Sequence, residues 1–489
     1  MTDSLEHYQG SRLLEGLSSQ TGLNVDQLNF VVSQLVALVI ASLYRTAFQP
    51  AKVSPKVRHG FGLIFGMWMS YFCFGYQALH LAGLPAVCYV VLLTQSPNIM
   101  HGTILLTAMI YLSLVHLHRQ LYEDSSFGLD ISGPLMVITQ KMSSLAFSLH
   151  DGLAKTEEEM TESQKYYAVT KIPSLLEFFS YSLMFPSLMA GPVIFYKDYI
   201  DFIEGHSLVH HRKSTMCSKG VVVHEPSPIR AVFKKLIVAT GCALVYVLFL
   251  PKFPISRVKA DEFVNSTTFG DKFWYLTVAT SLMRTKYYFA WTLADAICNN
   301  AGLGWNGSSW NGLSNVDIFR FEFGTSLKDS IDAWNRGTNL WLRFIVYKRV
   351  NKYSTFATFA LSAIWHGFYP GYYLTFLSGV LFTFASRTMR RHLRPYFLSS
   401  NESKLVYDLL TFTVTRFTLA YITFPFVLLE FYGSVIVYSK LYWSLHVLAI
   451  GVFWGAPHLI PKIQSGDKNG IAMAFSKTGP YSEAVAKID

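Results

Sequence analysis

The sequence predicts an all-α membrane protein that crosses the bilayer many times. Hydrophobic residues make up 51% of its 489 residues and charged residues only 15%, whereas a soluble domain carries about 25% charged residues. Many apolar stretches approach the roughly 20 residues that a helix needs to span a bilayer. Short basic loops separate these stretches, as expected for loops that face anionic headgroups in the cytoplasm. We expect roughly ten to twelve membrane segments, some of them re-entrant or broken.

The chain is predicted to contain one membrane domain with short polar ends. Residues 1–27 are a polar or interfacial lead-in, residues 28–460 a single transmembrane domain, and residues 461–489 a polar tail. The net charge of +10 is modest for this length. Because the sequence offers no contiguous basic face, we expect the lipid bilayer but no nucleic acid as a partner. The clearest expected spans are Leu28–Leu43, Phe61–Ala78, Leu81–Thr94, Gly102–His116 and Ala231–Leu250, with a break near Gly83 and Pro85.

Two apolar stretches carry features that a lipid-facing helix avoids. Residues Gly133–Leu149 contain Lys141, whose ammonium group should face protein, water or a headgroup rather than lipid tails. Residues Pro173–Ile194 contain Pro186 and the pair Gly191-Pro192. Helix breaks at membrane depth are tolerated where the backbone is buried in protein or lines a wet cavity. The second stretch is therefore predicted to be broken and enclosed.

The stretch Phe273–Ala301 has a polar and aromatic stripe. Tyr287, Trp291 and Asp295 recur every four residues, so on a helix they share one face. This pattern favours a helix that lines an internal chamber. The alternative is an interfacial helix whose aromatic residues lie at the level of the headgroups.

The most informative stretch extends from Trp334 to Tyr373. An amphipathic run that ends in basic residues is followed by a run that is apolar except for His366. Residues 354–364 cover roughly half a bilayer at about 1.5 Å per residue, and Gly367 and Pro370 interrupt the helix immediately afterwards. His366 is thus predicted at mid-membrane depth beside a helix break. There it can relay protons in a transporter, act as a general base in an enzyme, or pack against a backbone carbonyl.

These motifs resemble a known family. The pair WN at 334–335, a basic amphipathic helix and SAIWHG at 362–367 resemble the membrane-bound O-acyltransferases. PSLLEFFSYSLMFPSLMAGP at 173–192, MRTKYYFAWTLADA at 283–296 and WNRGTNLWLRFIVYKRV at 334–350 are similar to blocks of its lysophospholipid acyltransferase branch. TQKMSSLAFSLHDG and WHGFYPGYYLTF look most like the subgroup that acylates lysophosphatidylethanolamine and lysophosphatidylserine. The resemblance covers about residues 30 to 460.

The resemblance implies a helical bundle around a central chamber and a specific reaction. A fatty acyl group, expected to be unsaturated such as oleoyl, passes from acyl-CoA to the free hydroxyl of lysophosphatidylethanolamine, lysophosphatidylserine or lysophosphatidylcholine, in phospholipid remodelling. The family pattern implies His366 as catalytic base and Asn335 as its partner. It also implies a multi-pass protein of the endoplasmic reticulum membrane. Acyl-CoA is a co-substrate, and we expect no other cofactor and no metal.

The residue types agree with this chemistry. A base must take the hydroxyl proton, a donor must stabilise charge on the thioester oxygen or position the reactants, and a buried chamber must exclude water. Ser362 shares a helix face with His366 and is a candidate to touch the thioester; the alternative is a hydroxyl bonded to its own backbone. The other substrate-binding candidates, unless they are ordinary interfacial residues, are Trp334, Trp341, Arg343, Tyr347, Lys348, Lys352, Tyr287, Trp291 and Asp295.

Signatures of other acyltransferases and hydrolases are missing from the sequence. It contains no H-x-x-x-x-D motif, no G-x-S-x-G elbow and no H-E-x-x-H zinc site. Two alternatives stay open. One is the same chemistry on a sterol, a diacylglycerol or a protein acceptor. The other is a non-enzymatic transporter with a buried histidine. Headgroup preference and oligomeric state are left open by the sequence.

Overall fold

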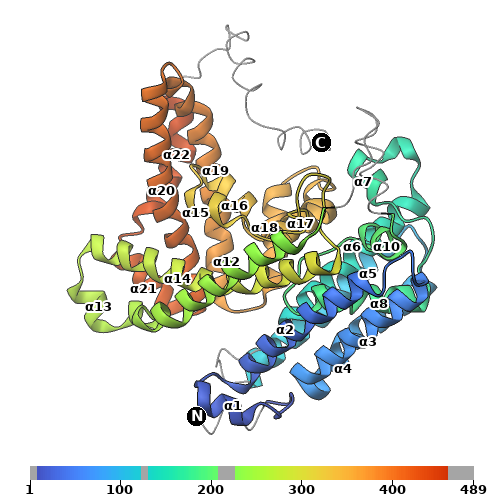
Figure 1. Ribbon diagram of the computed structural model, residues 1–489. Helices are drawn as coiled ribbons and strands as arrows, with labels where there is room; N and C mark the ends of the chain where they lie inside the picture. Colours follow the sequence, from blue (N-terminus) through green and yellow to red (C-terminus); the bar gives the residue numbers. More distant parts are fainter. Residues whose placement is uncertain (1–7, 123–129, 207–225, 461–489) are drawn as a thin grey trace.

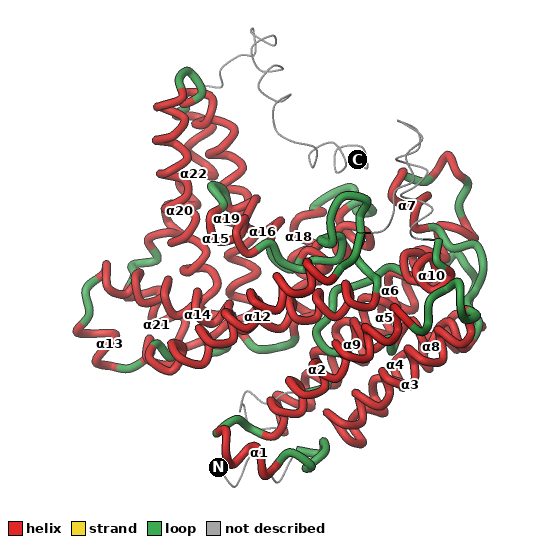
Figure 2. The backbone as a smooth tube through the Cα atoms, viewed as in Figure 1, coloured by secondary structure: helices red, strands yellow, loops and turns green. Residues whose placement is uncertain are grey.

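The computed structural model describes residues 8–122, 130–206 and 226–460. Within these ranges the chain consists of helices joined by loops, and no strand occurs (Figure 2). The predicted all-α class is therefore confirmed. The polar tail predicted at 461–489 lies outside the described residues, as do residues 1–7 of the predicted N-terminal segment.

The N-terminal part of the chain is built around one central helix, α6 (Figure 1). This helix contacts α4, α5, α7, α8, α9 and α10. The short helices α7 and α8 each begin with a capping box, in which side chains satisfy backbone N–H groups that the helix itself leaves unpaired. The helices of this part are α1 (Glu15–Thr21), α2 (Val25–Thr46), α3 (Pro55–Phe74), α4 (Ala78–Thr94), α5 (Met100–Tyr122), α6 (Ser132–Ala154), α7 (Glu162–Tyr167), α8 (Leu175–Ser182), α9 (Phe185–Leu188) and α10 (Tyr196–Glu204).

The C-terminal part contains two long helices that cross the molecule and a group that stands at one side (Figure 1). The long pair is α12 and α14, and the upright group is α19, α20 and α22. The elements are α12 (Ile229–Phe249), α13 (Asp261–Ser266), α14 (Phe269–Ala301), α15 (Ile318–Phe323), α16 (Leu327–Ala333), α17 (Arg336–Leu342), the π-helical turn η5 (Arg343–Tyr347), α18 (Ser354–His366), α19 (Pro370–Leu393), α20 (Asn401–Leu428), α21 (Phe431–Lys440) and α22 (Ser444–Leu459).

Several helices have the length and composition of membrane spans, which confirms a polytopic membrane protein. In the described part of the chain, five helical stretches qualify, or six if the pair α21 and α22, bent by 76°, is one span. This number is below the roughly ten to twelve segments expected from apolar length. Helices α6, α14 and α19 contain 23, 33 and 24 residues but are not among those that qualify. The five stretches are Val25–Thr46, Pro55–Thr94, Met100–Tyr122, Ile229–Lys259 and Asn401–Leu428.

The break predicted within residues 173–194 is confirmed, and Lys141 stabilises it. Helix α8 ends at Ser182 and the short α9 follows. The Lys141 side chain is 1% exposed. Its Nζ donates to the carbonyls of Tyr181 (3.0 Å) and Ser182 (3.4 Å) and to Ser187 Oγ (2.9 Å). The lysine therefore faces protein, as predicted, and satisfies carbonyls that the end of α8 leaves unpaired.

The break predicted near Gly83 and Pro85 is wrong. Pro85 lies inside α4, and the chain turns earlier, at Gly75, which separates α3 from α4. Gly75 has a φ of +55°, and a Cβ atom there would lie 2.0 Å from the carbonyl oxygen of Gln9. The close approach of the N-terminal chain therefore sets the turn, and this contact could not be read from the local sequence.

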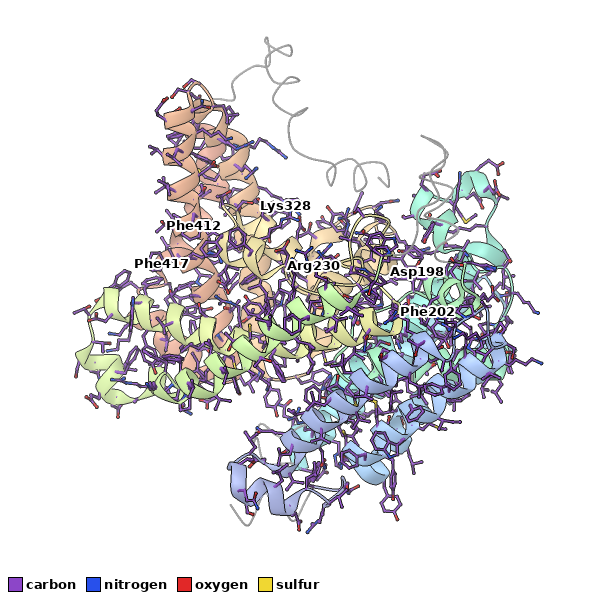
Figure 3. The ribbon with its side chains drawn as sticks, in the orientation of Figure 1. Asp198, Phe202, Arg230, Lys328, Phe412 and Phe417 are labelled. Carbon is purple, nitrogen blue, oxygen red and sulfur yellow. The ribbon has the colours of Figure 1, made fainter. Side chains whose placement is uncertain are left out.

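Buried side chains form two hydrophobic clusters. The first gathers residues of α2 to α10, the C-terminal half of α14, and residues of α17, η5 and α18 that include Trp341 and Trp365. The second gathers residues of α14, α19, α20, α21 and α22, with Trp334 packed against it. Figure 3 shows Phe202 of α10 and Phe417 of α20 on opposite sides of the molecule, one in each part. The segment from Trp334 to Trp365 therefore passes between the clusters.

Helices α18 and α19 form an antiparallel hairpin with His366 at its turn. Helix α18 ends at His366 and α19 begins at Pro370, so the helix break predicted after His366 is confirmed. At the open end of the hairpin, Arg387 of α19 donates to Thr355 at the start of α18 (Nη1–Oγ1 3.3 Å). The candidate base therefore lies at the opposite end of the hairpin from the basic residues of α19.

Candidate active site

His366 is surrounded by aromatic rings. Its ring centroid lies 4.7 Å from that of Trp365, 5.1 Å from Phe426, 5.3 Å from Phe376 and 5.8 Å from Tyr372. The side chain is nevertheless only half-buried. The imidazole is therefore sheltered from bulk water while part of it can still be reached, which is what transfer of a water-sensitive acyl group requires.

The turn after His366 depends on Gly367 and His116. Gly367 has a φ of +111° and packs against His116, so that a Cβ atom would lie 3.1 Å from the Cγ of that ring. The Nε2 atom of His116 donates to the carbonyl of Trp365 (3.2 Å). The imidazole of α5 thus holds the last turn of α18 in place, and with it the residue that ends the helix.

Asn335 begins α17 in a left-handed backbone conformation (φ +44°), which asparagine adopts more readily than most residues. Asn315, in the loop before α15, holds the start of the helix: its carbonyl accepts from Arg336 N (2.8 Å) and its Oδ1 from Gly337 N (2.9 Å). The Asn335 side chain does not cap the helix. Its amide is therefore not committed to supporting its own backbone.

Helix α6 is bonded to the segment that follows Asn335. The Nε2 atom of Gln140 donates to Thr338 Oγ1 (2.8 Å), and one turn further along, Ser143 Oγ accepts from Trp341 Nε1 (2.8 Å). All four side chains are buried. Since a buried polar group without a partner costs about 1–3 kcal/mol, these bonds fix the position of α17 on α6.

The same helix is bonded to the end of α18. The Nε1 atom of Trp365 donates to the carbonyl of Met136 (3.1 Å), one turn before Gln140. Trp365 also packs against Trp341, with ring centroids 5.7 Å apart. Neighbouring turns of α6 therefore anchor the two segments that carry the candidate catalytic residues, one tryptophan from each.

An aromatic cluster next to Asn335 contains three of the predicted substrate-binding residues. The Trp334 ring lies 4.9 Å from Trp291 and 5.7 Å from Tyr287 between centroids. The hydroxyl of Tyr287 is in turn close enough to that of Tyr372 for the two groups to interact electrostatically. Tyr372 flanks the His366 ring. Tyr287 thus contacts Trp334 beside Asn335, and Tyr372 contacts the His366 ring.

Asp295, predicted to line the same chamber, is instead a buried ion-pair partner. Its side chain is 4% exposed, and its Oδ2 lies 2.6 Å from Lys235 Nζ. Ser314 Oγ donates to the same oxygen (2.6 Å), and Lys235 also donates to Asn299 Oδ1 (2.8 Å). The placement of Asp295 in the chamber wall is therefore corrected: a buried carboxylate needs a cation and hydrogen bonds, and this one joins α12 to α14.

Trp341 is also a packing residue. It is 0% exposed and lies between α17 and α6, where its indole N–H is taken by Ser143. The prediction that it lies against the cofactor or at the membrane interface is therefore corrected. Trp334, seven residues earlier, is only partly buried and stays a candidate for substrate binding.

The predicted cationic segment is not one continuous helix. Helix α17 passes into the π-helical turn η5, and such turns occur frequently at functional sites. The four candidates for CoA binding in and after η5 are all exposed, whereas Ser362, one turn before His366, is buried (6% exposed). These exposed residues are Arg343, Tyr347, Lys348 and Lys352.

Sequence reasoning missed the residues that support the site. Arg349 pairs with the fully buried Asp151 of α6 (Nη1–Oδ1 2.8 Å) and lies over the Phe147 ring, so it fixes the end of η5. His116, Gln140 and Asp151 are polar residues in or at the ends of apolar stretches. The argument that singled out His366 would have found them too, but their partners are distant in the sequence.

Comparisons with known proteins identify the family of the chain. The model of the membrane-bound O-acyltransferase family matches residues 119–424. Lysophospholipid acyltransferase 6 of Drosophila melanogaster is 49% identical over 98% of this chain and 68% of its own length. Membrane-bound glycerophospholipid O-acyltransferase 2 of Homo sapiens is 41% identical over 96% of this chain and 92% of its own. Membrane-bound glycerophospholipid O-acyltransferase 1 of Mus musculus is 41% identical over 90% and 92%.

Proposed function

Because the chain belongs to the membrane-bound O-acyltransferase family, we propose that it transfers a fatty acyl group from acyl-CoA to the free hydroxyl of a lysophospholipid. The similar proteins of Drosophila melanogaster, Mus musculus and Homo sapiens carry names that describe lysophospholipid or glycerophospholipid acylation. The chain is accordingly an O-acyltransferase of phospholipid remodelling.

The proposed reaction needs no covalent enzyme intermediate. His366 removes the proton of the lysophospholipid hydroxyl while the oxygen attacks the thioester carbonyl carbon. The Asn335 amide donates to the thioester oxygen, on which negative charge develops. The carbon–sulfur bond then breaks, and the proton held on His366 passes to the departing thiolate. The products are a diacyl phospholipid and free CoA.

The anchoring of both segments on α6 is the observation that supports this assignment most. The bonds from Met136 and Gln140 place the end of α18 and the start of α17 on adjacent turns of one helix. A base and an oxyanion donor must be held together within a fraction of an ångström to be effective. Two residues on unconnected loops would not meet this requirement.

The donor and the location in the cell are further parts of the proposal. CoA is large and anionic, and the exposed cations Arg343, Lys348 and Lys352 with Tyr347 suit its phosphates and adenine. An unsaturated donor such as oleoyl-CoA is expected. The membrane is that of the endoplasmic reticulum, and the acceptors are lysophosphatidylethanolamine, lysophosphatidylserine or lysophosphatidylcholine. No cofactor other than the co-substrate is proposed.

Activity of the purified protein tests the proposal. Radiolabelled oleoyl-CoA and a panel of lysophospholipids should give labelled diacyl product. Product from a sterol, a diacylglycerol or a peptide, with none from any lysophospholipid, would show that the acceptor is wrong. If no acceptor is acylated and the protein instead moves protons or solutes across vesicles, the enzyme assignment itself fails.

Matched variants test the two residues. His366→Ala and Asn335→Ala should each lose almost all activity while the protein keeps its thermal stability. His458→Ala and Asn98→Ala are suitable controls, because both residues are exposed and lie outside the site. Full activity in either of the first two variants would show that the replaced residue is not catalytic, while the proposed acyl transfer to a lysophospholipid would still stand.

A further inference from the structure

A cavity lies among α19, α20 and α22, in the upright group at one side of the molecule (Figure 1). Its volume is about 170 Å³. Most of its wall is apolar, and two of its wall residues, Val414 and Leu448, are 49% and 58% exposed on the outer surface. Apolar side chains so exposed on membrane helices face lipid tails, so an acyl chain can reach the cavity laterally from the bilayer.

The cavity has a basic end. Arg390 lines it one turn before α19 ends, and Tyr407 of α20 lies in the same wall. Arg394 is close enough to Tyr407 to interact electrostatically with its hydroxyl. The basic end is thus within about 5–10 Å of the ends of α19 and α20, a depth that suits the phosphate of a lipid rather than its tail.

Two acidic groups lie near this end. Asp408 of α20 interacts electrostatically with the Tyr407 hydroxyl, and Asp329 is already engaged by other partners. Asp329 of α16 accepts from Ser326 Oγ (2.6 Å) and pairs with Arg320 (3.3 Å). Burial alone would raise the pKa of this carboxyl group, but these two partners lower it below its ordinary value, so the group is ionised at neutral pH. The three arginines Arg320, Arg390 and Arg394 against the two carboxylates Asp329 and Asp408 leave the region with a net charge of +1.

The cavity is separate from the candidate active site. His446 of α22 bridges α19 and α20 beyond the inner end of the cavity: its Nε2 bonds with Ser378 Oγ and its Nδ1 with Tyr421 OH, both at 2.9 Å. Ser378 lies one turn from the cavity residue Phe382, on the side toward His366. The side chains of this bridge do not line the cavity, and on α19 the bridge residue Ser378 lies between the cavity residue Phe382 and the Phe376 ring that contacts His366.

We propose that this cavity binds one molecule of an anionic phospholipid, with an acyl chain between α19, α20 and α22 and the phosphate at Arg390. The apolar wall of the cavity suits the acyl chain, and its cationic end at headgroup depth suits the phosphate. A zwitterionic phospholipid offers the same chain but no net charge for the arginines. The site is a resident-lipid site that holds the three helices together, and it does not depend on the acyl-transfer reaction.

The position of Arg390 argues against the acyl donor as the occupant. Phe376 contacts the His366 ring, and Arg390 lies 14 residues further along the same helix, which is about 21 Å. A CoA phosphate at Arg390 with its acyl chain in the cavity would point the thioester away from His366, behind the Ser378–His446–Tyr421 bridge. Acyl-CoA is therefore not the proposed ligand of this cavity, and the experiment below checks whether it competes with the lipid.

Binding of a defined lipid to the full-length protein tests the proposal. The purified protein is delipidated in detergent and supplied with dioleoyl phosphatidylglycerol or dioleoyl phosphatidylcholine, and bound lipid is counted by native mass spectrometry alongside the melting temperature. Wild-type protein should retain one phosphatidylglycerol and melt several degrees higher than with phosphatidylcholine. Equal retention of both lipids, or no retention, would overturn the proposal.

Four variants locate the lipid. Arg390→Gln should lose at least half of the phosphatidylglycerol-specific shift, whereas Arg391→Gln, at an exposed neighbour outside the cavity wall, should keep it. Ala449→Phe fills the cavity and should abolish retention. His366→Ala should retain the lipid fully. Wild-type retention in Arg390→Gln, displacement of the lipid by oleoyl-CoA, or loss of the lipid in His366→Ala would each place it elsewhere.

Discussion

Replacing Gly367 with alanine should disturb the candidate base without touching its ring. Gly367 has a φ of +111° and a ψ of −163°, a conformation essentially restricted to glycine, and another residue held there costs about 1–3 kcal/mol. The new methyl group would also lie 3.1 Å from His116 Cγ, whereas carbon atoms pack best at about 3.5–4.0 Å. The variant therefore introduces both backbone strain and a steric clash.

The protein can respond in two ways, and each has a measurable size. If the turn keeps its geometry, the variant loses about 1–3 kcal/mol of stability and its melting temperature falls. If the turn relaxes, the imidazole of His366 moves by about 1 Å, which costs on the order of 10²-fold in turnover. Turnover of oleoyl-CoA with lysophosphatidylethanolamine and the melting temperature in detergent distinguish the two responses.

Two companion variants separate strain from steric clash. His116→Ala removes the clashing ring and also the bond to the Trp365 carbonyl, so the double variant is compared with His116→Ala alone. Gly367→Ala should cost less in that background than in the wild type, because only the unfavourable φ then remains. Gly102→Ala, at a helical glycine with no atom near the new methyl group, should be neutral or slightly stabilising. Wild-type turnover and melting temperature in Gly367→Ala would refute the view that this turn positions His366.

Three further perturbations follow from the contacts. Ser143→Ala leaves the Trp341 N–H without its acceptor and should cost about 1–3 kcal/mol, measured as a lower melting temperature, while Ser143→Thr keeps the hydroxyl and most of the stability. Lys235→Met leaves the Asp295 carboxylate buried without its cation and should cost about 3–5 kcal/mol; the double variant with Asp295→Asn should melt higher than Lys235→Met, and a lower melting point would contradict the ion-pair role. Lys352→Gln should raise the KM for oleoyl-CoA by about 1.5- to 5-fold at unchanged kcat, and an unchanged KM would remove this residue from the CoA path.

Composition and motif spacing predicted the features that depend on local sequence. The all-α membrane class, the break after His366 and the break within residues 173–194 all follow from apolar runs interrupted by glycine and proline. The exclusion of Lys141 from lipid tails also follows, because a lysine there is too costly, although the sequence left protein, water and headgroups open as its surroundings. Each of these features is caused by residues that lie close to it in the sequence.

The features that the sequence did not predict depend on partners far along the chain. Asp295 shares a helix face with Tyr287 and Trp291, but its environment is decided by Lys235, which lies 2.6 Å away on another helix. Trp341 is buried because Ser143, 198 residues before it in the sequence, accepts its N–H. Helical periodicity identifies a face but not what covers it, so these two candidates were misplaced while Trp334 and Trp291 came together.

The anchoring of two segments on α6 has a consequence for the protein in membranes of different thickness. Helices respond to a mismatch with the bilayer largely by tilting. Because Met136, Gln140 and Ser143 lie within two turns of α6, a tilt of this helix carries the end of α18 and the start of α17 with it. The separation between the two segments is then preserved while their depth changes. The same chain can therefore work in thin and thick bilayers without readjusting the groups around the reacting atoms.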